Sequence, residues 1–160
     1  MTALAQADGA RQMATGRQFY VRIAAACVAV AVIGFAPTYW LPLVRGTLNV
    51  PRISHVHAAV FYGWTLLFLV QTWLAANRKF TRHRELGVFG VALATTMCFV
   101  GMAAAITSLK QSTADGFGDA VRAFTIVPVS GIVFFAALFT VALLKVKQLE
   151  THKRLMLVAT

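Results

Sequence analysis

The sequence predicts an all-α transmembrane helical bundle with four complete spans and the start of a fifth. Of its 160 residues, 59% are hydrophobic and only 12% are charged, whereas soluble domains carry about 25% charged residues. Four stretches contain no Asp, Glu, Lys or Arg: residues 23–44, 53–77, 86–109 and 123–144. Because about 20 helical residues cross a hydrocarbon core about 30 Å thick, each stretch is long enough to span a membrane.

The two ends of the chain differ in character. Residues 1–18 form a polar segment that we expect in the cytoplasm, and residues 19–160 form a single transmembrane helical domain. The polar segment has no apolar core of its own, which a cleavable signal peptide needs, so the first span is expected to be retained. After the fourth span, "HKRLMLVAT" starts an apolar run that stops after a few residues. We therefore expect the chain to be truncated within a fifth span.

The first two spans carry polar and aromatic residues that suit a membrane helix. The first ends in "GFAPTYWLPL", where Pro37 and Pro42 interrupt a regular helix and Tyr39 and Trp40 suit the head-group region. The second contains one strongly polar interior side chain, Gln71, and an amide in hydrocarbon seeks a partner on a neighbouring helix. We expect Gln71 to form a helix–helix hydrogen bond.

The third and fourth spans differ in how they are expected to pack. The third carries small residues one heptad apart at Gly87, Ala94 and Gly101. Small side chains let helix backbones approach closely, which drives packing where lipid supplies no hydrophobic force. This helix is therefore expected at the centre of the bundle. In the fourth span, Pro128 together with Gly131 favours a kink.

The basic residues are unevenly divided between the two sides of the predicted spans. Eleven lie on one side: Arg11, Arg17, Arg22, Arg78, Lys79, Arg82, Arg84, Lys145, Lys147, Lys153 and Arg154. Four lie on the other: Arg45, Arg52, Lys110 and Arg122. Short loops rich in Lys and Arg face the cytoplasm. We therefore expect a bacterial inner-membrane protein whose N-terminus lies in the cytoplasm. The formal net charge of +10 then reflects this topology and attraction to anionic lipid head groups, and no nucleic-acid partner is expected.

Two histidines are expected on the cytoplasmic side. His83, in "TRHRELG", and His152, in "THKRLML", each follow a span and lie in a basic cluster, a weak sign of two related helical hairpins. Transmembrane electron carriers hold haem b between histidines of facing helices, so a haem b or transition-metal site at this pair is one hypothesis. Against it, neither His83 nor His152 lies inside an apolar span, and both are flanked by Arg or Lys.

The other two histidines are expected on the outer side. His55 and His57 form an HxH pattern that is a candidate metal site, with Asp115 and Asp119 as further ligands. In a helix, two residues correspond to about 200° of rotation, so the rings would diverge, and zinc or copper also wants a third ligand. In the alternative interpretation, Ser54 or His55 caps the helix N-terminus and His57 lies at the polar boundary.

Three classes of function stay open. A non-enzymatic accessory or structural subunit, packing against other membrane subunits or a second copy through the third span, fits most of these observations. The alternatives are a haem b- or metal-binding redox protein that uses the interfacial histidines, and a small-molecule transporter. The transporter has the weaker support, because the spans contain no Asp, Glu, Lys or Arg. The sequence contains no GxSxG, phosphate-loop or HExxH motif.

The ordered string "FAPTYW…HVHA…GWTLLFLVQ…HRELG…HKRLM" resembles a family of uncharacterised bacterial multi-pass inner-membrane proteins. The resemblance covers most of the chain from Phe19 onward. It implies a membrane bundle whose chain continues for a further helix or two after "HKRLM", and it carries no activity. A looser similarity to four-helix b-type cytochromes rests only on hydropathy and histidines.

Overall fold

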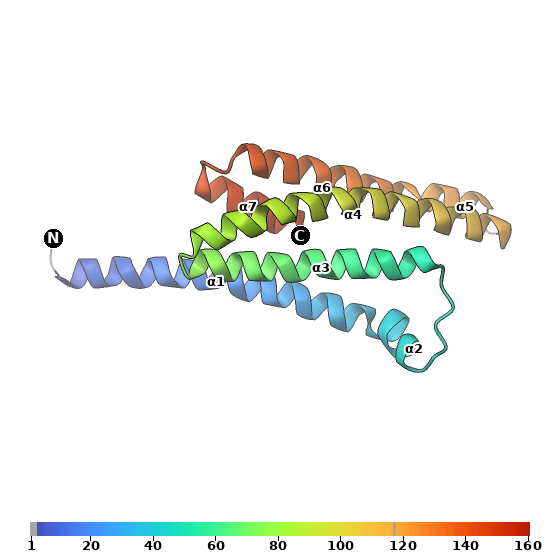
Figure 1. Ribbon diagram of the computed structural model, residues 1–160, viewed down its shortest axis with the longest axis horizontal. Helices are drawn as coiled ribbons and strands as arrows, with labels where there is room; N and C mark the ends of the chain where they lie inside the picture. The colour runs from blue at the N-terminus through green and yellow to red at the C-terminus, as the bar shows by residue number, and fades with distance from the viewer. Residues whose placement is uncertain (1–2, 117) are drawn as a thin grey trace.

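The computed structural model describes residues 3–116 and 118–160, and over these residues it contains only helices and their connections (Figure 1). Four helical segments are long and apolar enough to cross a membrane: Gln18–Val44, Arg52–Ala76, Phe80–Ala114 and Val121–Leu144. They coincide with the four uncharged stretches. The predicted all-α transmembrane bundle is therefore confirmed.

The first span consists of three helical pieces, α1 (Ala3–Phe35), the π-helix η1 (Ala36–Trp40) and α2 (Leu41–Val44). The helix already includes the polar segment from residue 3, so the start of α1 projects beyond the other helices (Figure 1). Pro37 has no N–H to donate to the carbonyl four residues earlier, and the chain widens into a π turn at this point.

A tight turn joins α3 (Arg52–Ala76) to α4 (Phe80–Ala114). The Lys79 N–H bonds the Leu74 carbonyl at 2.9 Å, and the Arg78 N–H bonds the Ala75 carbonyl at 3.1 Å. This pair of bonds forms a Schellman cap, which needs a left-handed residue at its centre. Arg78 takes that place with a φ of 58°. Because α4 starts before the uncharged stretch does, His83 lies within a helix.

The fourth span is interrupted between α5 (Gly118–Phe124) and α6 (Ile126–Leu144). Pro128 cannot donate a hydrogen bond to the carbonyl of Phe124, and its ring crowds that carbonyl, so the helix breaks at Thr125. The predicted kink is thus a break that precedes the proline. After a short turn, α7 (Leu149–Ala159) folds back into the bundle beside α6 (Figure 1).

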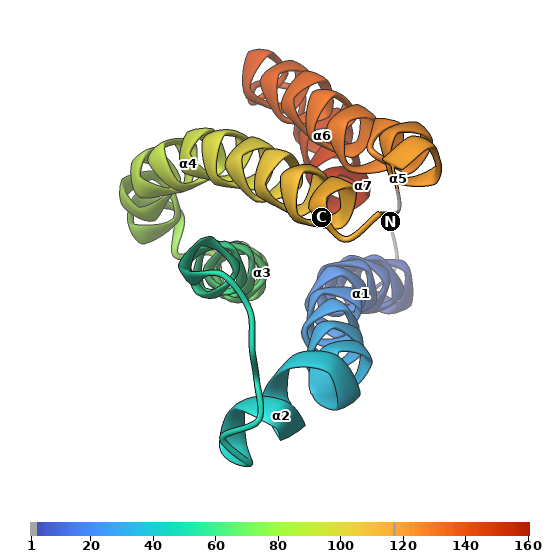
Figure 2. The ribbon, with the colours of Figure 1, turned by 90° about the vertical axis from the view of Figure 1, so that its right-hand side faces the viewer.

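Successive spans pack side by side, α1 on α3, α3 on α4 and α4 on α6, and α7 lies among them (Figure 2). The core consists of Trp64, Ala94, Met97 and Phe139. Met156 of α7 packs against this core, and Trp64 Nε1 donates to the Thr160 hydroxyl at 3.3 Å. The C-terminal helix therefore belongs to the bundle.

Helix α4 is central, as predicted from its small residues. Gly90, Ala94, Gly101 and Ala105 are all buried. A Cβ at Gly101 would lie 3.1 Å from Ile132 of α6, and one at Gly90 would lie 3.3 Å from a side chain of α3. The small-residue stripe is thus packed against other helices of this chain.

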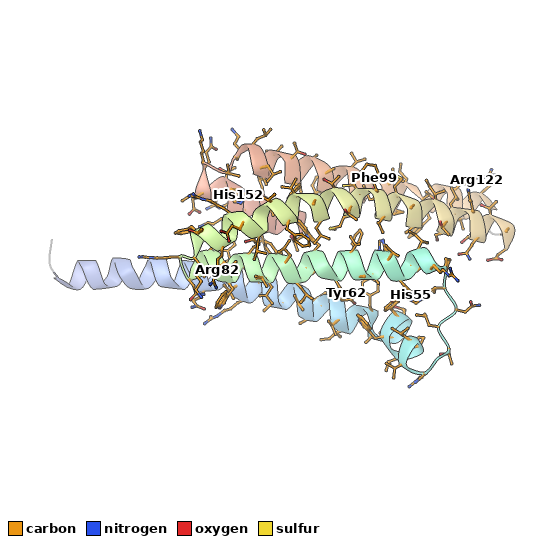
Figure 3. The ribbon with its side chains drawn as sticks, viewed as in Figure 1. His55, Tyr62, Arg82, Phe99, Arg122 and His152 are labelled. Atoms are coloured by element: carbon orange, nitrogen blue, oxygen red, sulfur yellow. The ribbon has the colours of Figure 1, made fainter. Side chains whose placement is uncertain are left out.

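Large apolar side chains cover the outside of the bundle. Phe99 is 74% exposed and Val88 is 75% exposed, and both lie on α4 (Figure 3 labels Phe99). In water such a surface would drive aggregation, whereas in a bilayer it faces hydrocarbon of the same polarity. The exterior therefore agrees with an integral membrane protein.

Candidate functional site

His83 and His152 occupy equivalent places in two helical hairpins. His83 is the fourth residue of α4, which follows α3, and His152 is the fourth residue of α7, which follows α6. The backbone N–H of each histidine makes the bond that opens its helix, to Lys79 and to Gln148 respectively. The two hairpins suggested by the sequence thus present their histidines in the same way.

Each of these imidazole rings is fixed by a backbone carbonyl of the preceding helix. His83 Nδ1 lies 3.3 Å from the Gln71 carbonyl oxygen, and His152 Nδ1 lies 2.8 Å from the Ala142 carbonyl oxygen. A carbonyl oxygen only accepts hydrogen bonds, so Nδ1 carries the proton in both rings. In the neutral rings, the lone pair is then on Nε2.

The side chain of Gln71 joins α3 to α4 near the turn of the first hairpin. Its Nε2 donates to the His83 carbonyl oxygen at 3.1 Å, which confirms the predicted helix–helix hydrogen bond. Its Oε1 is buried and has no hydrogen-bond partner in the part of the chain that the structure describes. The site therefore contains a buried acceptor that a further donor would satisfy.

His83 and His152 lie on the first turns of α4 and α7. Their imidazole groups lie within electrostatic range of each other, and Arg84 also acts on His83. Arg82 and His152 lie at the same end of the molecule (Figure 3). Among the described residues, no third His, Cys, Asp or Glu completes a group of metal ligands. His83 and His152 are therefore the two candidate ligands at this end of the bundle.

At the opposite end, His55 belongs to an aromatic cluster. The Tyr39 hydroxyl and His55 Nδ1 are 2.9 Å apart, which ties η1 to the start of α3. Next to it, Trp40 Nε1 donates to the Tyr62 hydroxyl at 2.9 Å, and that hydroxyl donates to the Ala31 carbonyl at 2.8 Å. This cluster connects the first two spans at the end of the bundle opposite His152 (Figure 3 labels His55 and Tyr62).

The remaining candidate metal ligands have separate surroundings. The His57 ring stacks on Phe61, with the ring centroids 4.1 Å apart, and its buried Nδ1 has no partner among the described residues. Asp119 pairs with Arg122 at 3.5 Å, and Asp115 caps the end of α4. His55 and His57 thus have different partners, as helical spacing requires.

The hydrogen bonds to backbone carbonyls were not predicted from the sequence, because a hairpin geometry decides which carbonyl a histidine reaches. The signal available was the similar "RHR" and "THKR" context of the two histidines after a span.

Comparisons with protein-family models, curated proteins and solved structures found no match.

Proposed function

We propose that this chain is an integral protein of a bacterial inner membrane that binds haem b through His83 and His152. In this proposal the N-terminus and the histidine pair lie on the cytoplasmic side. The observation that carries the proposal is the matched hydrogen bonding of the two rings, Nδ1 to a backbone carbonyl in each case.

This hydrogen bonding suits a metal-ligating histidine. An imidazole that donates its Nδ1 proton to a carbonyl is held in one tautomer, and its Nε2 becomes a better donor of electron density to a metal. Both histidines have this arrangement, and they lie on two different helices close to each other. In this proposal, the two Nε2 atoms would hold the iron of the haem.

The number of ligands favours haem over a single metal ion. A porphyrin supplies four nitrogen ligands of its own, so two histidines complete the coordination of its iron. Zinc and copper ions want three or four protein ligands, and the described residues provide no third His, Cys, Asp or Glu at this site. The neighbouring Arg84 also suits the negative propionates of a haem.

The protein's own groups would hold the cofactor and set its electronic properties. Haem with two axial histidines supplies one-electron transfer when bound. The carbonyls of Gln71 and Ala142 orient the two rings, and the positive charge of Arg84 beside His83 would contribute to the reduction potential of a bound haem.

The other functions have less support. The accessory-subunit hypothesis depended on the small-residue stripe of α4, which packs within this chain at Gly90, Ala94 and Gly101. The transporter hypothesis needs polar groups lining a path, and the hydroxyls of Thr95 and Thr96 instead bond carbonyls of their own helix. The histidine pair is the feature that neither hypothesis uses.

A visible spectrum tests the haem proposal. The full chain, expressed with added haem precursor and purified in detergent, is expected to show a Soret band and sharp α and β bands on reduction. His83→Ala and His152→Ala should each lose most of the bound haem. His55→Ala, at the opposite end, should retain it. Purified protein that contains neither haem nor iron would contradict the proposal, and about one zinc or copper per chain would exclude haem.

Labelling from outside the cell tests the orientation. On a background of Cys27→Ser and Cys98→Ser, Thr81→Cys places a thiol at the end that carries His83, and Thr113→Cys places one at the other end. A membrane-impermeant maleimide should label Thr113→Cys in intact spheroplasts and Thr81→Cys only after lysis. The reverse pattern would overturn the orientation while leaving the haem proposal standing.

A further inference from the structure

The α3–α4 turn encloses a basic hollow that the proposed haem site does not use. We infer that this hollow binds the phosphate of an anionic membrane phospholipid. It has a volume of about 330 Å³ and is lined by Arg78, Lys79, Phe80, Thr81 and Arg82. These residues are exposed.

The three cationic side chains of the hollow are available to an anion. Among the side chains that the structure describes, no carboxylate lies within salt-bridge distance of Arg78, Lys79 or Arg82. The acidic residue that follows them in sequence, Glu85, forms no such bridge either. Guanidinium groups bind phosphate through paired hydrogen bonds, so two arginines and a lysine around one hollow match a phosphate in charge and geometry.

The backbone adds donors to the same hollow. Helix α4 begins at Phe80, and Lys79 at its N-cap provides no side-chain hydrogen bond to the first turn. The first N–H groups of an α-helix have no partner within the helix and carry partial positive charge. Phe80, Thr81 and Arg82, which carry such N–H groups, all line the hollow.

Aromatic residues place the hollow at head-group depth. The Lys79 ammonium lies 4.5 Å from the centroid of the Trp73 ring, and Trp73 is 45% exposed at the end of α3. Tryptophan prefers the membrane–water interface, and the ring and Phe80 offer apolar contact to the upper part of an acyl chain. A phospholipid satisfies both the cationic and the apolar parts of this surface, whereas a free phosphate satisfies only the first.

The backbone of Arg78 allows a sharp mutational test. Its φ of 58° lies in the left-handed region, where glycine is favoured. Arg78→Gly therefore removes the positive charge and also relieves the backbone strain of the turn. Arg82→Gln removes a second charge from an exposed helical residue. Arg45→Gln removes one charge at the opposite end and serves as the control.

Native mass spectrometry of the full chain provides the readout. The protein is exchanged into detergent with equal phosphatidylglycerol and phosphatidylcholine, and retained lipid is counted. We expect retention of phosphatidylglycerol over phosphatidylcholine, and a loss of about fivefold in each of Arg78→Gly and Arg82→Gln. Arg45→Gln should match the parent chain, and Arg78→Gly should unfold at a higher temperature.

Two results would overturn the inference. Equal phosphatidylglycerol retention by all three variants would show that the hollow is not the site. Release of the lipid by millimolar inorganic phosphate would show that a free anion, and not a phospholipid, is the better ligand. Neither result depends on whether the chain binds haem.

Discussion

Gln71 and His83 are joined by two hydrogen bonds that run in opposite directions across the α3–α4 turn. The amide of Gln71 donates to the backbone carbonyl of His83, and the ring of His83 donates to the backbone carbonyl of Gln71. One residue pair therefore fixes both the hairpin and the orientation of a candidate ligand. The second hairpin fixes His152 with the carbonyl of Ala142 alone.

Replacing the amide tests the first of these bonds. Gln71→Leu should lower the free energy of unfolding by about 1 kcal/mol, because the side-chain bond across the turn is lost. The change is measured by thermal or denaturant unfolding in detergent. Gln111→Leu, at an exposed site of α4, is the matched control and should have little effect. Equal stability of Gln71→Leu and the parent chain would show that the bond contributes nothing.

The tautomers of the histidines are a second prediction. Because carbonyls accept from Nδ1, neutral His83 and His152 should both carry their proton on Nδ1. Nitrogen-15 NMR of the imidazole rings distinguishes the two tautomers directly. His55 provides the comparison, because the Tyr39 hydroxyl can donate or accept and imposes neither form. Protonation of Nε2 in either ring would remove the main support for a ligand pair.

The sequence was sufficient to predict the spans and the separation of the histidines. Uncharged length alone locates membrane helices, because the cost of a charge in hydrocarbon exceeds any local preference. The second span was expected over residues 53–77 and is found at Arg52–Ala76. His152 and Arg82, the residue before His83, lie at one end of the bundle and His55 lies at the other, as the number of spans between them predicts (Figure 3).

Partners of side chains were harder to predict than the spans. The heptad of small residues in α4 indicates close packing but does not say whether the neighbour is another span or another chain. The structure places Leu67 beside Gly90, and Phe61 and Ile132 beside Gly101. Similarly, "HVH" does not reveal that His55 meets Tyr39 while His57 stacks on Phe61. These contacts depend on how helices from distant parts of the chain approach.

The outer aromatic cluster yields a third prediction. Tyr62→Phe removes a hydroxyl that accepts from Trp40 Nε1 and donates to the Ala31 carbonyl, so an indole N–H loses its partner. We expect unfolding free energy to fall by about 1–2 kcal/mol, measured in detergent. Tyr20→Phe serves as the control, since no hydrogen bond of its hydroxyl ties two spans together. A Tyr62→Phe variant as stable as Tyr20→Phe would show that the hydrogen bonds of the Tyr62 hydroxyl contribute nothing to stability.

The close contact between α4 and α6 yields the last prediction. A Cβ at Gly101 would lie 3.1 Å from Ile132 Cδ1 and 3.5 Å from the Phe61 ring, so Gly101→Leu cannot fit without separating the two helices. We expect it to lower the unfolding free energy by about 2 kcal/mol, because overpacking forces side chains out of their preferred rotamers. Gly131→Leu is the matched control on α6, since a Cβ there meets nothing within 4 Å. If the two variants unfold at the same temperature in detergent, the packing of α4 against α6 is incorrect.

The same variant also tests whether the core and the histidine pair depend on each other. If Gly101→Leu alone is destabilised and also loses bound haem, the two are coupled through α4, which carries both Gly101 and His83.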